Sequence, residues 1–219
     1  MTMANEDTTV GRALRGLASD NASTRLRAAL AVGTAPDPRS VDELVGRCAI
    51  EPDFQVREML TWALTRHPAA LTLPPLLGEL RSERTQARSQ ALHTLSKIGD
   101  GRAWPAITPE LMTDPDDEVA RSAWRAAVVL VPGGAEAGLA AALAAQLGRG
   151  GRETRLSLSR ALIALGEAMT PAVRAATSDP RPAVRAHAIA TEKLSLDPDA
   201  GFDFAIEEAK RIVALGPKE

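Results

Sequence analysis

Three polar side chains have the types and spacing of a catalytic set. Ser89 and His93 are four residues apart, and Glu58 lies 31 residues before Ser89. Residues four apart share one face of a helix, so these side chains imitate a nucleophile, a base and an acid. A serine nucleophile also needs a strained, exposed backbone site and an oxyanion hole, and a serine in the middle of a helix has neither nearby. We therefore expect no catalytic residue here.

Metal and phosphate chemistry have less support. The three histidines and the single cysteine are too few and too scattered for a zinc site. The stretch "GRGG" at residues 148–151 lacks the Lys-Ser/Thr ending of a phosphate-binding loop and follows a helical pattern, so we interpret it as a turn. We expect no metal and no cofactor.

The stretch "DFQVREMLTWAL", Asp53–Leu64, favours binding rather than catalysis. Its apolar residues have the spacing of one buried helix face, whereas Glu58 and Trp62 fall on a neighbouring face. Tryptophan is enriched at binding hot spots. The predicted binding patch lies on the non-core positions of successive helices and consists of Glu58, Trp62, Ser89, His93, Ser122 and Arg125. The alternative, an ordinary solvated surface with one exposed tryptophan, stays open.

The helices that must position this patch recur along the chain. An arginine preceded by a small or apolar residue and followed by the same apolar pattern occurs six times, at Arg27, Arg57, Arg88, Arg121, Arg155 and Arg185. The separations are 30, 31, 33, 34 and 30 residues. A period of this size is typical of stacked helical repeats. The position three after each arginine is apolar, which predicts that Leu30 and Trp124 belong to the core.

Each repeat has the pattern of two helices. The second begins after a turn signal such as "EPDF" or "SDPRP", where Asp, Ser and Pro suit a helix start. The predicted first helices are Thr9–Ala18, Ser40–Ala49, Leu73–Arg81, Arg102–Met112, Ala135–Leu147 and Ala168–Ala176. A last helix, Gly201–Leu215, has a charged outer face, as a terminal cap requires.

The segments "DPDDEVARSAW" and "SDPRPAVRAHA" resemble the short HEAT-like repeats of about 30 residues, also called the phycobilin-lyase type. The resemblance implies an all-α, right-handed solenoid of about six helix pairs plus a C-terminal capping helix. We assign residues 1–7 to a flexible N-terminus, 8–216 to a single solenoid domain and 217–219 to a tail. In this family the second helices line the concave surface, which is where we expect the binding patch.

The recurring arginines have two interpretations. They are either a ladder of charges that grips phosphates, or a structural device that joins repeats by binding an acidic side chain or helix-end carbonyls. The candidate acidic partners, each just before a second helix, are Asp20, Asp53, Asp114 and Asp179. A residue that recurs in every unit has a role that every unit requires, and every unit must stack on its neighbours. We therefore favour the structural role.

Composition limits the choice of partner. The net charge is −2, whereas a free-standing nucleic-acid binder is usually basic. The single Cys48 cannot form an internal disulfide, the first residues do not resemble a signal peptide and no apolar stretch has the length of a membrane span, so we expect a cytoplasmic chain outside the membrane.

We therefore expect a non-enzymatic, monomeric scaffold that binds another protein or peptide on its concave surface, with nucleic acid disfavoured. The family resemblance leaves two alternatives open. One is an enzyme or lyase subunit of the HEAT-like lyase type. The other is a HEAT-like DNA glycosylase or DNA-binding repair protein, in which Trp62 and Glu58 would contact the nucleic acid.

Overall fold

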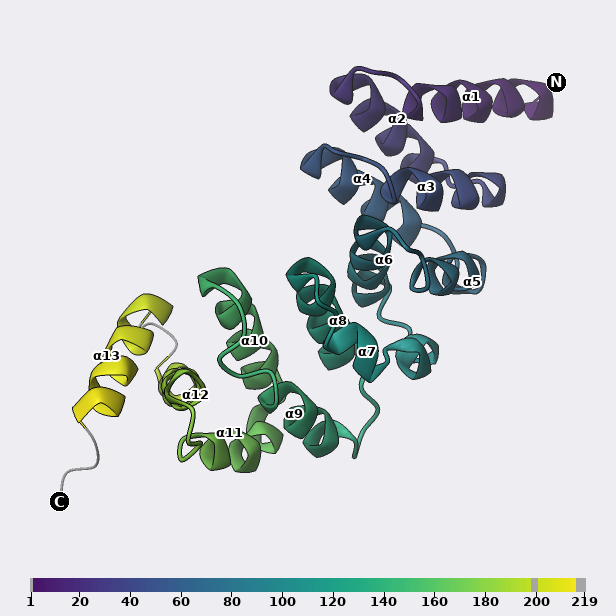
Figure 1. Ribbon diagram of the computed structural model, residues 1–219. Coiled ribbons are helices and arrows are strands. Elements are labelled where there is room, and N and C mark those ends of the chain that lie inside the picture. The colour runs from purple at the N-terminus through teal and green to yellow at the C-terminus, as the bar shows by residue number, and fades with distance from the viewer. Residues whose placement is uncertain (1, 198–200, 216–219) are drawn as a thin grey trace. The chain divides into compact units, whose positions relative to one another are not determined.

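The computed structural model describes residues 2–197 and 201–215. All regular elements in these ranges are helices, which confirms the all-α fold class (Figure 1). The chain divides into two compact units, Met1–Ala106 and Ile107–Glu219. The single solenoid over residues 8–216 stays a prediction.

The first unit contains three helix pairs. They are α1 (Thr2–Leu17) with α2 (Ala22–Thr34), α3 (Val41–Cys48) with α4 (Phe54–Thr65), and α5 (Ala69–Glu79) with α6 (Thr85–Ile98). A 3₁₀ turn, Pro38–Ser40, precedes α3, and another, Gly101–Ala106, ends the unit. The second helices contact one another in order, α2 with α4 and α4 with α6.

The second unit continues the pattern. Its pairs are α7 (Pro109–Met112) with α8 (Asp117–Leu130), α9 (Glu136–Ala144) with α10 (Arg152–Ala164), and α11 (Thr170–Ala176, after a 3₁₀ turn Gly166–Met169) with α12 (Pro182–Leu196). The last helix, α13 (Phe202–Leu215), packs on α12.

The turn chemistry explains where the second helices start. The Asn21 side chain accepts a hydrogen bond from the Thr24 amide, and Asp53 accepts one from the Val56 amide. Asp116 accepts from the amides of Glu118 and Val119. Each side chain satisfies backbone donors that the first turn of a helix leaves unpaired.

Several predicted helix boundaries differ from the structure; α9, for example, ends at Ala144 rather than at Leu147. The helix predicted at Arg102–Met112 is split into Gly101–Ala106 and α7, because Pro105 and Pro109 cannot continue an α-helix. Helix α5 begins at Ala69 rather than Leu73. Helix α1 begins at Thr2 rather than Thr9, so residues 2–7, assigned to a flexible N-terminus, lie in a helix. The tail at 217–219 lies outside the described residues.

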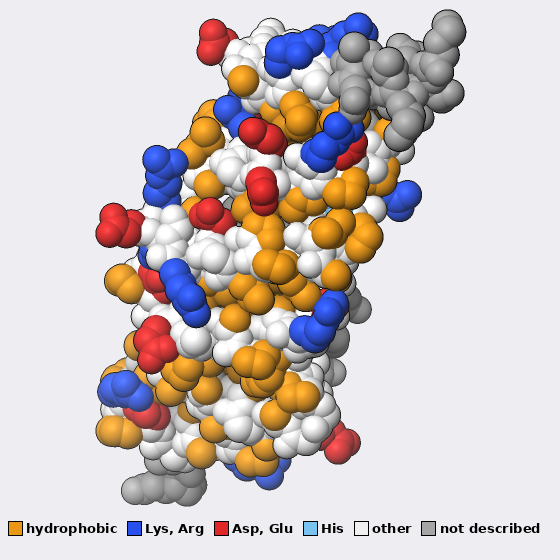
Figure 2. All heavy atoms as spheres, turned by 90° about the vertical axis from the view of Figure 1, so that its right-hand side faces the viewer, with side chains coloured by type: hydrophobic (Ala, Val, Ile, Leu, Met, Phe, Trp, Pro, Cys, Tyr) orange, Lys and Arg blue, Asp and Glu red, His pale blue; other side chains and the backbone are white. Residues whose placement is uncertain are grey.

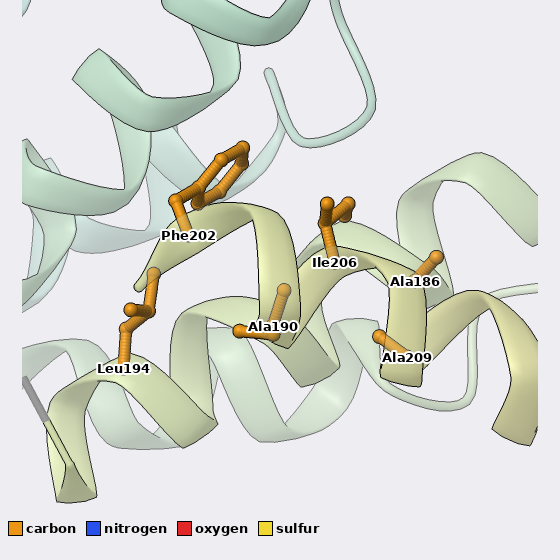
Figure 3. Close-up of a cluster of buried hydrophobic side chains, with 7 residues drawn as sticks. Ala186, Ala190, Leu194, Phe202, Ile206 and Ala209 are labelled. Carbon is orange, nitrogen blue, oxygen red and sulfur yellow. The ribbon is translucent and has the colours of Figure 1, made fainter. Parts of the chain in front are cut away.

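The core of the second unit includes the contact between α12 and α13. Its buried residues, drawn as sticks in Figure 3, are Ala186, Ala190, Leu194, Phe202, Ala205, Ile206 and Ala209. Four small alanines let the two helices approach closely, and the Phe202 ring of α13 lies edge-on to the ring of His187 on α12, with the ring centroids 6.1 Å apart. Helix α13 thus buries the side of α12 that carries Ala186 and Ala190.

Candidate functional site

Four of the six predicted patch residues lie in the first unit, on α4 and α6. Trp62 is 38% exposed, which confirms that it is not a core residue. Glu58 lies one turn before it on α4. From α6, the Nε2 atom of His93 lies 3.0 Å from Oε1 of Glu58, so a protonated His93 forms an ion pair across the two helices. The structure therefore brings Glu58 and His93 into direct contact.

Ser89 does not complete a catalytic set. Its hydroxyl donates to the carbonyl oxygen of Gln86 in its own helix, at 3.2 Å. This is the usual hydrogen bond of a serine in the middle of a helix, whose hydroxyl donates to a carbonyl of the preceding turn. What the geometry offers is a polar pair, Glu58 and His93, beside an aromatic ring.

Trp62 is fixed by the neighbouring helix. Its ring lies against Gly33 of α2, close enough that a β-carbon at Gly33 would be 2.3 Å from ring atom Cζ3. On its own helix, the guanidinium carbon of Arg66 lies 6.0 Å from the ring centroid, within the range of a cation–π interaction. One part of the ring is packed and the other faces solvent, an arrangement suited to contact with a partner.

Helix α2 extends this surface. Leu30 was predicted to belong to the core, but its side chain is 45% exposed. The buried residue is Ala28, which lies three positions after Arg25. The N-cap residues of α2, α4 and α6 are Asn21, Asp53 and Arg84. The residues five and nine positions after each N-cap occupy equivalent places in the three helices. We call this set of residues the unit 1 stripe, and it consists of Leu26, Leu30, Glu58, Trp62, Ser89 and His93.

The other two predicted patch residues lie in the second unit, on α8. Ser122 is only 3% exposed, so its assignment to an exposed patch is wrong. Its hydroxyl accepts a hydrogen bond from Nη2 of the exposed Arg125, at 2.9 Å. Helix α8 has one extra residue between its N-cap, Asp116, and the repeated arginine, which turns Ser122 toward the core. Trp124 is fully buried as predicted, and its indole N–H donates to the Met112 carbonyl.

The repeated arginines bind backbone carbonyls in the turn of their own helix pair. In three repeats, Nη1 donates to the carbonyl oxygens six and five residues earlier. The pairs are Arg57 with Glu51 and Pro52, Arg88 with Ser82 and Glu83, and Arg185 with Asp179 and Pro180, at 2.7–3.2 Å. Arg155 donates to the Gly148 carbonyl at 3.2 Å. These contacts are the helix-end carbonyl bonds that we considered, but they close the turn within a pair.

Two repeats depart from this pattern. In the first, Arg25 donates to the carbonyls of Ser19 and Asp20, whereas the predicted Arg27 is exposed. In the fourth, Arg121 forms an exposed pair with Glu118, and Arg149 from the next turn donates to the Asp114 carbonyl and to Asp117. The extra residue in α8 explains the second exception, because it moves Arg121 out of reach of the turn.

Arg25 also contributes to a link between repeats that we did not predict. Its guanidinium donates twice to the fully buried Glu51 carboxylate, at 2.7 Å, and Arg47 donates to the same group. Burial alone raises the pKa of Glu51, but hydrogen bonds from Arg25, the Asp53 amide and Arg47 outweigh it and lower the pKa to about 2. Glu51 is therefore ionised at neutral pH, and its carboxylate joins the first two helix pairs.

Each unit also has a buried polar contact between second helices. In the first unit the hydroxyl groups of Thr61 and Thr94 lie 3.2 Å apart, and Gln90 donates to Thr61. In the second unit the corresponding pair is Ser159 and Thr191, at 2.8 Å, with His187 in the position of Gln90. A hydroxyl residue eight positions after the N-cap, in both α4 and α10, is the sequence signal for this contact.

Charged side chains of both signs are mixed on one face of the molecule, and the described residues include no candidate metal site. On the face seen in Figure 2, basic and acidic side chains are interspersed among hydrophobic ones, so neither sign of charge covers that face. Among the residues that the structure describes, no three His, Cys, Asp or Glu side chains are grouped to hold a metal ion. No described helix is both long enough and apolar enough to cross a membrane.

Comparison with known families gives one result. Residues 48–128, from the end of α3 almost to the end of α8, match the model for HEAT repeats. The match supports a HEAT-repeat protein and does not distinguish the phycobilin-lyase type. No curated protein matches the sequence.

Proposed function

We propose that this chain is a non-enzymatic binding module whose unit 1 stripe engages a partner protein or peptide. HEAT repeats commonly mediate protein–protein interaction, and residues 48–128 match them. The observation that carries the proposal is the half-packed ring of Trp62, held against Gly33 and 38% exposed.

The neighbours of Trp62 suggest the chemistry of the partner. Leu26 and Leu30 extend the apolar area on α2, and Glu58 and His93 supply polar anchors on α4 and α6. A partner that covers the ring with an apolar side chain and hydrogen-bonds to the Glu58–His93 pair would use both halves of the stripe. Aromatic anchors at the centre of such surfaces contribute most of the binding free energy.

A selection from a displayed peptide library tests the proposal. Peptides selected on the full chain should bind the Trp62→Ala variant at least about 30-fold more weakly, which corresponds to about 2 kcal/mol or more. Phe54→Ala is the matched control, because Phe54 is an aromatic on the same helix, 65% exposed and outside the stripe. We expect its affinity to change by less than about threefold.

Protein stability must be measured in parallel, since the ring of Trp62 also packs on α2. Thermal melting followed by circular dichroism gives the range in which Trp62→Ala is folded, and binding is compared there. A second variant, Glu58→Ala, removes the polar anchor without disturbing Gly33. Peptides that lose affinity for Phe54→Ala but not for the two stripe variants would place the binding surface elsewhere.

A further inference from the structure

A hollow of about 370 Å³ lies in the second unit between α10, α12 and α13. This volume is within the range of about 300–1,000 Å³ that is typical of small-molecule sites. The residues that line it are Arg155, Pro182, Ala183, Arg185, Ala186, Lys210, Val213 and Ala214. None of them belongs to the unit 1 stripe.

The lining combines an apolar floor with positive charge. The floor consists of small alanines, a proline and Val213, while Arg155, Arg185 and Lys210 contribute three cations. No acidic residue of the described chain is among the lining residues. Two described carboxylates interact with the lining cations from outside the hollow: Glu207 pairs with Lys210 at 2.6 Å on the exposed side of α13, and Asp179 interacts electrostatically with Arg185.

The two arginines are held in place by the turns of their own repeats. Arg185 uses Nη1 to bind the carbonyls of Asp179 and Pro180, and Arg155 uses Nη2 to bind that of Gly148. These bonds fix each guanidinium before any ligand arrives, so less side-chain entropy is lost on binding.

We propose that this hollow binds a small amphiphilic anion, with its carboxylate or phosphate head against Arg155, Arg185 and Lys210 and its apolar body on the alanine floor. Charge complementarity selects the head, because guanidinium groups form paired hydrogen bonds with carboxylate and phosphate oxygens. The small side chains of Ala183, Ala186 and Ala214 leave room for the body. Helix α13 completes the site by supplying one wall.

Isothermal titration calorimetry with the full chain tests the proposal, using decanoate, decyl phosphate and decanol below their aggregation limits. We expect one saturable site for an anion and at least about tenfold weaker binding of decanol. Tighter binding of decanoate or of decyl phosphate assigns the head as carboxylate or phosphate. Decanol that binds as well as both anions would overturn the proposal, as would the absence of saturable binding by either anion.

Variants separate the site from general stability. Lys210→Gln removes an exposed cation, and Ala214→Trp fills the hollow from an exposed position. Both should weaken binding of the preferred anion about tenfold without unfolding the chain. Arg155→Gln should also weaken binding of the preferred anion. The control is Arg88→Gln, which alters the corresponding turn arginine of the first unit and should leave binding of the anion unchanged. Equal affinities across these variants would show that the anion binds elsewhere and that the assignment is wrong.

Discussion

The indole ring of Trp62 and the backbone of Gly33 are in direct contact. A β-carbon at position 33 would lie 2.3 Å from Cζ3 of the ring and 2.9 Å from the Cα atom of Ala63. Carbon atoms that are not bonded to each other do not approach this closely, so any larger residue at position 33 would clash where α2 meets α4. The Trp62 ring occupies the space that a side chain at position 33 would fill. The packing of the first two repeats therefore determines where the ring lies.

Gly33→Ala is therefore expected to destabilise the first unit, although alanine is the better helix former by about 1 kcal/mol. Overpacking typically costs about 1–3 kcal/mol, and here the obstacle includes backbone, which cannot rotate away. The matched control is Gly46→Ala in α3, where a β-carbon meets no atom within 4 Å. Urea unfolding should show a net loss for position 33 and a gain of up to about 1 kcal/mol for position 46. Equal gains at both positions would contradict the close contact.

The fold could be predicted from the sequence because the repeat carries its own signals. A helix pair per repeat, the turn residues and the terminal helix all follow from a segment that occurs six times at a spacing of 30–34 residues. Errors arose where the register changes by a residue or two. The alignment on Arg27 instead of Arg25 placed Leu30 in the core, and the extra residue in α8 placed Ser122 on the surface. A single sequence gives no independent check on such a shift.

The candidate site was less predictable than the fold. That Glu58 and Trp62 share a stripe follows from helical spacing, and Trp62 is exposed as expected. The contact of Glu58 with His93 depends on how α4 and α6 pack, which spacing along one helix does not determine. His187 is one of the three scattered histidines of the sequence, yet it is fully buried and its ring contacts the Ser159 hydroxyl and two backbone groups. Its partners come from another helix and another turn.

Arg88→Ala tests the structural role of the repeated arginines. The variant leaves the Ser82 and Glu83 carbonyls without their shared donor, and we expect the free energy of unfolding to fall by about 1–3 kcal/mol. Arg27→Ala is the control, because that side chain is exposed and outside the turn-binding position; its effect should stay within about 0.5 kcal/mol. A parent-like melting curve for Arg88→Ala would instead favour a ligand-binding role for the arginines.

Glu51→Ala should be far more damaging than removal of a surface carboxylate. It leaves the guanidinium of Arg25, which is 5% exposed, without its anion, and breaking a buried pair in this way costs about 3–5 kcal/mol. Glu207→Ala removes the exposed partner of Lys210 and should cost no more than about 1 kcal/mol. Chemical denaturation at neutral pH distinguishes the two. Comparable small losses would mean that the Arg25–Glu51 link contributes little.

The last prediction concerns pH and His187. The Gly148 amide donates to Nδ1 at 3.0 Å, so Nδ1 is the acceptor and Nε2 carries the proton, which points at the Arg155 carbonyl and the Ser159 hydroxyl. Protonation of Nδ1 would place its N–H directly opposite the N–H of Gly148, and the two donors would repel each other. Burial is the main cause that lowers the pKa of His187 to about 4, and the nearby Arg155 charge adds to it, while the hydrogen bond to the Arg155 carbonyl opposes both.

Because the folded pKa lies below the unfolded value of 6.5, the neutral ring contributes stability that is complete above about pH 6.5 and is lost as the pH falls through about 4. The full loss is on the order of 3 kcal/mol. His187→Asn should lower stability at pH 7 and flatten the fall in unfolding free energy between pH 6.5 and 4. His67→Gln, which alters another buried histidine with a lowered pKa, should keep most of that fall. Urea titrations across this range measure both. An acid-induced loss that persists undiminished in His187→Asn would mean that a different group is titrating.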